Sequence, residues 1–156
     1  MKLTDVGLDW PPDSKIEVLI GAEKPRTLAL SGELASGTVI TGGTSPDGLR
    51  DALRHISAGY ANSNGIDRHS TVVYVVCTTG PDAARKLRDE LAYWKYDPSN
   101  DLAAYGTPEE IAAAATRWID AGADTIVFQP PGDADIESFV DVIGGRVQPL
   151  IAARTS

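Results

Sequence analysis

The chain has 156 residues, of which 42% are hydrophobic and 23% are charged, a mixture typical of a single globular domain. A chain of this length buries roughly two-thirds of its unfolded surface, which is enough for a substantial core. Its net charge of −8 argues against nucleic acids and anionic membrane surfaces as partners, because no basic face is available to neutralise phosphates.

Short β-rich runs alternate with helical patterns along the chain. The predicted strands are Ile16–Ile20, Thr38–Thr41, Thr71–Thr78 and Thr125–Gln129. The predicted helices cover approximately Pro25–Ala35, Pro46–Ala61, Pro81–Trp94, Pro108–Ala121 and Asp135–Ile151. The strand runs are continuous and β-branched, which is typical of parallel strands covered on both faces by crossover helices. We therefore predict an α/β fold with four parallel strands.

Capping signals support two of these helices. Ser45 and Pro46 provide an N-cap and a proline at the first helical position. Thr107 and Glu110 have the spacing of a capping box, and Gly122 follows the same helix as a C-terminal glycine. The boundaries of both helices are therefore predicted from the sequence.

The turns that follow the strands are the places where chemistry is expected, because ligands of parallel α/β folds lie at the carboxyl ends of strands. These turns are Gly21–Pro25, Thr41–Ser45, Thr78–Pro81 and Gln129–Asp133. Backbone amides beside a helix start, with Lys24 and Arg26 nearby, favour a phosphate site at the first two. Glycine at a βα turn can equally serve only a left-handed backbone, and a hydroxyl before proline only a cap. The residues alone leave both interpretations open.

The cysteine and the two histidines do not indicate a catalytic or metal site. Cys77 stands alone within an apolar run, which predicts a buried and inert thiol. His55 and His69 are the only histidines and belong to no Cys/His cluster, so we expect solvated or capping roles and no metal site. The N-terminus lacks a signal-peptide core and no apolar run is long enough to span a membrane, which predicts a soluble, cytoplasmic protein.

Three separate stretches resemble one known family. GAEKPRTLALSGELASGTVITGGTSPDGLRDAL, TVVYVV and YGTPEEIAAAATRWIDAGADTIVFQPPG occur in the order seen in the luciferase-like monooxygenase superfamily, and they are most similar to members that use a deazaflavin coenzyme. Members of that family are TIM (βα)8 barrels of about twice this length. The resemblance therefore implies that residues 16–156 form the C-terminal half of such a barrel, with residues 1–15 as a leader segment.

The resemblance also implies cofactor contacts at the first two turns. The family wraps backbone amides around the flavin or deazaflavin phosphate at the positions of Gly21, Ala22, Glu23 and Lys24. The next strand end, which faces cofactor and substrate, corresponds to Thr41, Gly42 and Gly43, and Gln129 and Pro130 correspond to the mouth of the barrel. Glu23 departs from the family pattern, since many relatives have glycine or a small residue there. An inward-pointing carboxylate would repel a phosphate, and Lys24 would offset it.

The family's first four strands, which supply the ring platform and the usual catalytic residues, have no counterpart in this chain, so we expect no catalytic residue here. The expected function is the C-terminal half of an oxidoreductase or monooxygenase that uses coenzyme F-420 or FMN. The alternative is a non-catalytic relative acting as a structural or cofactor-binding subunit. A half-barrel exposes two sheet edges, which favours a homodimer or pairing with a separate N-terminal half. Otherwise the leader Met1–Asp13 and the connection Tyr93–Gly106 would cover the edges.

Overall fold

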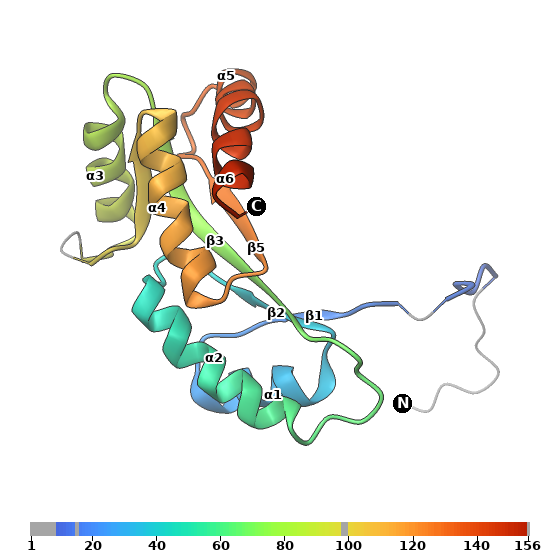
Figure 1. Cartoon of the computed structure of the whole chain (residues 1–156). Coiled ribbons are helices and arrows are strands. Elements are labelled where there is room, and N and C mark those ends of the chain that lie inside the picture. The colour runs from blue at the N-terminus through green and yellow to red at the C-terminus, as the bar shows by residue number, and fades with distance from the viewer. Residues whose placement is uncertain (1–8, 15, 98–99, 156) are drawn as a thin grey trace.

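The computed structural model describes residues 9–14, 16–97 and 100–155 and contains one parallel sheet flanked by helices (Figure 1). The strands are β1 (Leu19–Gly21), β2 (Gly37–Ile40), β3 (Ser70–Thr79), β4 (Ala103–Gly106) and β5 (Thr125–Gln129). The helices are α1 (Pro25–Leu34), α2 (Pro46–Tyr60), α3 (Ala83–Tyr93), α4 (Pro108–Ala121), α5 (Ile136–Val142) and α6 (Gln148–Thr155), with a π-helical segment η1 (Ile143–Val147) joining the last two. The predicted α/β class is confirmed.

β3 is the central strand, and it has three neighbours. It pairs with β2 through residues 70–73, with β5 through residues 72–76 and with β4 through residues 76–79. Val72 pairs with both β2 and β5, while Val76 pairs with both β4 and β5. β2 and β4 therefore lie end to end along the same edge of β3. Without β4, the remaining strands follow chain order, β1-β2-β3-β5, as consecutive strands of a barrel do.

β4 corrects the predicted number of strands from four to five. It lies inside the connection Tyr93–Gly106, for which the sequence predicted no strand. Its sequence, AAYG, is short and lacks the β-branched residues that mark the other strands. The strand forms because the end of β3 extends past β2 and offers unpaired backbone groups to Ala103–Gly106.

β1 is shorter than predicted and begins at Leu19 instead of Ile16. The reason is the position of its partner, because β2 begins at Gly37, which lies opposite Leu19. Before that point, the Ser36 amide donates a single hydrogen bond to the Val18 carbonyl at 2.9 Å. Ile16 and Val18 are consequently exposed.

The two faces of the sheet are covered by different helices. The main core contains Val73, Val75 and Cys77 of β3 together with side chains of α1, α2, α4, α5 and η1. A second, smaller cluster contains Val76 of β3, with Leu87 and Leu91 of α3. Successive residues of a strand point to opposite faces, so α3 lies on the face opposite the other helices. Figure 1 shows α3 and α4 on either side of β4.

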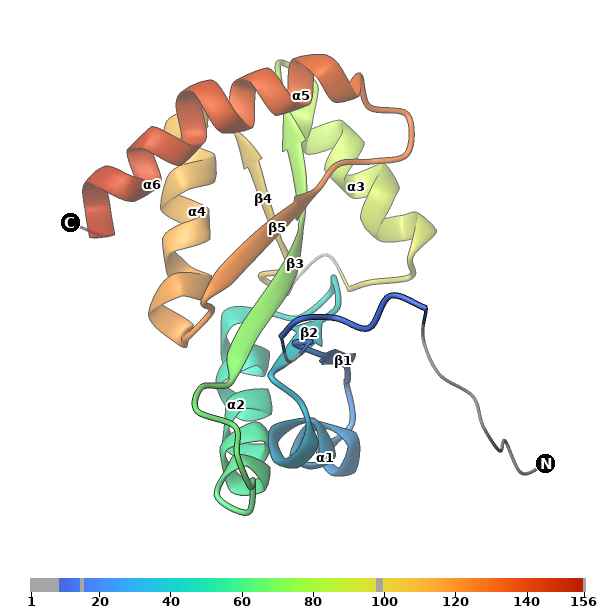
Figure 2. The ribbon, with the colours of Figure 1, turned by 90° about the vertical axis from the view of Figure 1, so that its right-hand side faces the viewer.

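The handedness of crossover connections explains the position of α3. The chain moves from β2 to β3 with α2 on the outer face, and then from β3 back to the β2 side to form β4. A right-handed crossover in the reverse direction places its helix on the opposite face of the sheet. α3 is therefore forced onto the inner face, the one that would line a barrel, and the views in Figures 1 and 2 agree with this arrangement.

The predicted caps are confirmed. The Ser45 side chain accepts a hydrogen bond from the Gly48 amide at 3.1 Å at the start of α2. Thr107 and Glu110 form a reciprocal capping box at the start of α4, and Gly122 ends that helix in the left-handed region, with φ of 110°. These local signals fix the ends of two helices that pack against the core.

Two glycines allow α1 and α2 to pack backbone to backbone. A Cβ atom built on Gly32 would lie 2.1 Å from the carbonyl oxygen of Ile56, and one built on Gly59 would lie 1.8 Å from the carbonyl oxygen of Ala29. Contacts this short are impossible, so neither helix has room for a side chain at its crossing point. The close approach of α1 and α2 thus depends on both glycines.

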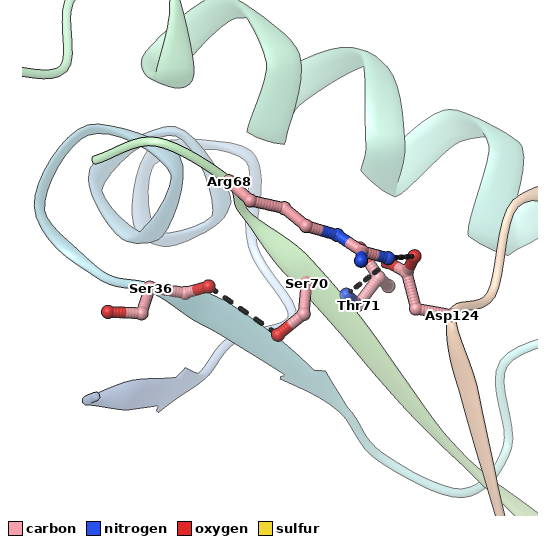
Figure 3. Close-up of polar contacts among 5 residues, drawn as sticks. All are labelled: Ser36, Arg68, Ser70, Thr71 and Asp124. Carbon is pink, nitrogen blue, oxygen red and sulfur yellow. Dashed lines mark hydrogen bonds and ion pairs between the residues drawn. The ribbon is translucent and has the colours of Figure 1, made fainter.

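Polar contacts hold the amino ends of the strands in register (Figure 3). Asp124, just before β5, accepts hydrogen bonds from the Thr71 amide at 2.8 Å and from the Arg68 guanidinium at 2.8 Å. The Ser70 amide donates to the Ser36 carbonyl at 2.9 Å, and the Ser70 hydroxyl donates to the same carbonyl at 3.4 Å, the bond that Figure 3 draws. One carboxylate therefore joins the start of β5 to the start of β3.

The inner face is only partly covered. α3 covers the end of β3, but Tyr74 and Leu19, lower on the same face, remain 37% and 40% exposed. The prediction that the strands are covered on both faces therefore holds for only part of β3. Of the predicted leader cover, residues 1–8 and 15 lie outside the described residues, and residues 9–14 are exposed.

Candidate functional site

The first predicted cofactor turn joins β1 to α1. Gly21 ends β1, and a Cβ atom built on it would meet no atom within 4 Å, so the backbone is open to approach from outside. Ala22 is buried, and its amide donates to the Val39 carbonyl at 3.2 Å as part of the sheet. Lys24 occupies the N-cap of α1 without a side-chain cap, and Pro25 follows at the first helical position. The first amides of α1 are therefore not satisfied by a capping side chain.

The second predicted turn lies beside the first. The Thr41 hydroxyl donates to Oε1 of Glu23 at 2.7 Å, which joins the end of β2 to the β1–α1 turn. Both residues are exposed, so the structure brings the two predicted turns together on an accessible surface. The Glu23 carboxylate faces this second turn, where a phosphate would meet its negative charge.

Tyr96 covers the second turn, a contact that no sequence pattern predicts. Its hydroxyl donates to the Gly42 carbonyl at 2.7 Å. A Cβ atom built on Gly43 would lie 2.5 Å from Cζ of Tyr96, and Gly43 itself has φ of 88°. Burial raises the pKa of Tyr96, and the negative charge of Glu23 raises it further. The phenol therefore stays protonated and remains a donor at neutral pH.

A third side chain holds the same turn from the core. The indole Nε1 of Trp118, on α4, donates to the Thr44 carbonyl at 2.9 Å, and the Trp118 side chain is fully buried. This bond joins the β2–α2 turn to the main core. The β2–α2 turn is thus fixed by residues from β1–α1, α4 and the segment after α3.

A pocket of about 340 Å³ lies between the starts of α1 and α2. Its lining includes Glu23 and Gly43 from the two turns, Asp51 and His55 from α2, and Leu102 from the connection to β4. The pocket therefore adjoins both turns but carries two carboxylates and no lysine or arginine. Its charge disfavours a phosphate inside it.

The other two strand ends also have defined surroundings. Thr78 is buried and donates from its hydroxyl to the Ala83 carbonyl at 2.8 Å, which closes the β3–α3 turn. Gln129 ends β5, and its Oε1 would lie 3.5 Å from a Cβ atom built on Gly42. Gln129 and Pro130 also line a pocket of about 540 Å³ beside Trp94 at the end of α3. The end of β5 therefore lies close to the second turn.

The remaining candidates have structural roles. His69 contacts the Thr38 hydroxyl at 2.8 Å and the Ala35 carbonyl at 3.0 Å, and the Thr38 hydroxyl in turn contacts Ser31 at 2.7 Å. Cys77 is buried, and burial raises the pKa of its thiol to about 12. Within the described part of the chain, no group of three or more metal-binding side chains is found, and none of the helices has the length and apolar character required to cross a bilayer.

A family model of the luciferase-like monooxygenases matches residues 3–117, which is more than half of the chain. The chain belongs to the luciferase-like monooxygenase family. A comparison with curated proteins finds no match. The family resemblance indicated by the sequence is thereby confirmed.

Solved structures of similar fold include three enzymes that share 14–16% of their residues with this chain. A coenzyme F-420-dependent tetrahydromethanopterin reductase from Methanopyrus kandleri is 16% identical with a TM-score of 0.67, over 86% of this chain and 50% of that one. An F-420-dependent secondary alcohol dehydrogenase is 16% identical with a TM-score of 0.71, over 90% and 50%. A long-chain alkane monooxygenase is 14% identical with a TM-score of 0.59, over 88% and 41%.

These likenesses concern the fold. This chain spans about half the length of the structures that it matches, as the half-barrel prediction requires. The sheet order β1-β2-β3-β5 gives the same result from the chain's own hydrogen bonds. The C-terminal half of a TIM barrel is therefore the architecture of this chain, and β4 lies outside its β1-β2-β3-β5 order.

Proposed function

We propose that this chain supplies the C-terminal half of an oxidoreductase or monooxygenase barrel and that its first turn holds the phosphate of a flavin-type cofactor, coenzyme F-420 or FMN. The observation that carries the proposal is the uncapped start of α1 beside an open Gly21. Lys24 and Arg26 add two positive charges, and neither has an ion pair among the described residues. Unpaired amides at a helix start together with cations favour an anion.

The residues of the first turn fit a phosphate better than those of the second. The amide of Ala22 belongs to the sheet, so the donors available are the first amides of α1 and the Lys24 side chain. At the second turn, Glu23 and Tyr96 occupy the polar groups of Thr41 and Gly42. We therefore assign the phosphate to Gly21–Lys24, and contacts with the remainder of the cofactor or with substrate to Thr41, Gly42 and Gly43.

The bound cofactor would supply hydride transfer or oxygen activation at its ring system. The role of this chain would be to bind and orient that cofactor at the carboxyl ends of the strands. No residue of the described part is assigned an acid or base role. His69 bonds to Thr38 and Ala35 away from the proposed contacts, and His55, which lines the pocket beside Gly43, is assigned no step. Catalytic groups would come from a separate N-terminal half.

The sheet itself favours such a partner. β1 and β5 are the two outer strands of the β1-β2-β3-β5 order, and each leaves one edge without a neighbour in the described residues. Leu19 and Tyr74 are partly exposed on the inner face between those edges. Unpaired parallel edges and an exposed apolar face favour association. Sedimentation of a monomer with a cooperative thermal transition would contradict this proposal.

The test is a fluorescence titration of the protein with FMN and with coenzyme F-420, alone and with a candidate N-terminal half. Lys24→Ala should weaken binding, because it removes a cation from the phosphate. Arg154→Ala, which removes the same charge from the last turn of α6, is the control and should leave the affinity unchanged. If neither cofactor binds under any condition, the proposed function is wrong; if Lys24→Ala binds normally, the phosphate lies elsewhere.

A non-catalytic subunit is the second candidate function. The observation that favours it is the closed second turn, where Tyr96 and Glu23 occupy the groups that would contact a ligand. Such a protein would bind an N-terminal half or a second copy without forming a competent cofactor site. Cofactor binding by the isolated chain or the assembled pair would exclude a purely structural subunit, and turnover by the assembled pair would exclude a cofactor-binding but non-catalytic one.

A further inference from the structure

We propose that Tyr96 is an internal occupant of a ligand subsite at Gly42, and that a hydroxyl or N–H group of the ligand replaces its phenol hydroxyl. The proposal rests on the proposed function, because the ligand in question is the same flavin-type cofactor. The two turns would then bind different parts of the ligand. The first turn takes the anion, and the second takes a hydrogen-bond donor.

The geometry shows that Tyr96 fills the space that a ligand would need. The built Cβ position of Gly43 lies 2.5, 2.6 and 3.0 Å from three carbon atoms of the phenol ring, so the ring rests directly on the glycine backbone. The hydroxyl reaches the Gly42 carbonyl at 2.7 Å and is partly buried there. While the phenol is in place, its ring and hydroxyl occupy the space beside this carbonyl.

The backbone that carries Tyr96 is anchored, so withdrawal involves its side chain. Lys95 has φ of 58°, a left-handed conformation that turns the chain at the end of α3. The Tyr96 amide then donates to the carbonyl of the buried Leu91 at 2.9 Å. Because α3 is fixed to the inner face through its own leucines, rotation of the phenol about its side-chain bonds opens the subsite without moving the helix.

The Gly42 carbonyl oxygen, which Tyr96 leaves on withdrawal, determines which ligand groups can bind there. The Gly42 carbonyl oxygen is an acceptor, so a ligand that displaces Tyr96 must bring a donor to avoid losing a hydrogen bond. An unprotonated phosphate oxygen has no hydrogen to donate, and its negative charge would also meet the Glu23 carboxylate, which already accepts from Thr41. The ribityl hydroxyls and ring N–H groups of flavins and deazaflavins have the required chemistry.

The experiment compares binding of FMN, riboflavin and inorganic phosphate to four proteins: wild type, Tyr96→Ala, Tyr96→Phe and Tyr93→Ala. Tyr96→Ala should bind FMN and riboflavin at least tenfold more tightly, because no side chain has to leave the subsite. Its affinity for inorganic phosphate should equal that of wild type. Tyr93→Ala removes an exposed tyrosine from the end of α3 and should bind as wild type does.

Tyr96→Phe keeps the test decisive if the alanine variant does not fold. It retains the ring and removes only the hydroxyl, so riboflavin should bind severalfold more tightly than to wild type. Riboflavin affinity equal to wild type in both Tyr96 variants, with FMN still bound, would overturn the Tyr96 subsite and leave the proposed function standing. Tighter phosphate binding by Tyr96→Ala would also overturn it, since the subsite would then be anionic. Absence of FMN and riboflavin binding in every protein would overturn both proposals.

Discussion

Gly59→Ala is the substitution for which local propensity and tertiary packing predict opposite results. Alanine is the better helix former by about 1 kcal/mol, so propensity alone predicts a more stable protein. In the structure the new methyl group would lie 1.8 Å from the Ala29 carbonyl oxygen and 2.6 Å from its carbonyl carbon. These are backbone atoms, which cannot move aside as a side chain can.

The size of the effect follows from that geometry. α1 and α2 must separate by about 1.5 Å before the methyl–oxygen contact becomes ordinary, which loosens the packing of both helices. Overpacking of a well-packed interface typically costs about 1–3 kcal/mol, and a clash with rigid backbone belongs at the upper end. After the gain in propensity, we expect a net loss of about 2 kcal/mol in the free energy of unfolding, or about 4–8 °C in Tm.

Urea denaturation followed by circular dichroism and tryptophan fluorescence measures this change. Gly145→Ala in η1 is the matched control, since a Cβ atom built there would meet nothing within 4 Å. That variant should gain about 0.5–1 kcal/mol through propensity and a less flexible unfolded state. Gly59→Ala with wild-type stability or better would refute the backbone packing of α1 on α2.

Three further outcomes follow from the fold. Asp124→Ala should lower the free energy of unfolding by about 1–3 kcal/mol, because the Thr71 amide at the start of β3 loses its acceptor. Arg68→Ala should lower it by less than about 1 kcal/mol, and urea denaturation distinguishes the two variants. Cys77, with its pKa raised to about 12, should react with a thiol reagent at pH 8 only after denaturation. Asp135 caps α5, and hydrogen bonds from Ser138 lower the pKa of its carboxyl group. The ionised carboxylate therefore stabilises the folded protein above pH 3.8, and this stabilisation is lost as the pH falls through the folded pKa. An Asp135→Asn variant should show a smaller acid-induced decrease in Tm.

Much of this fold could be predicted because its signals are local. Continuous β-branched runs identified the strands, and the Thr107–Glu110 box fixed the start of α4 to the residue. β4 was missed because Ala103–Gly106 has no intrinsic strand signal and depends on the free end of β3. The side of the sheet on which α3 lies depends on that pairing, so the sequence could not indicate it either.

The sequence predicted that the two candidate turns are neighbours, but not the contacts that they make. The Gly21–Lys24 and Thr41–Gly43 turns lie side by side, as their places after adjacent strands imply. The contact of Tyr96 with Gly42 joins residues 54 positions apart through a segment without regular patterning, and no local rule predicts it. Glu23 was the departure from the family pattern that the sequence showed. Its carboxylate faces the second turn, which for that reason does not suit a phosphate.

Because β4 lies end to end with β2 along one edge of β3, the sheet consists of the barrel order β1-β2-β3-β5 and one strand outside that order. α3 and β4 leave the end of β3 and return to it, and they contribute none of the hydrogen bonds that join β1, β2, β3 and β5. They are therefore an excursion from half a barrel, although Ala104 of β4 is buried in the main core and ties the excursion to it. Tyr96 follows α3 in that excursion, so the packing of α3 on β3 positions the phenol that closes the second turn.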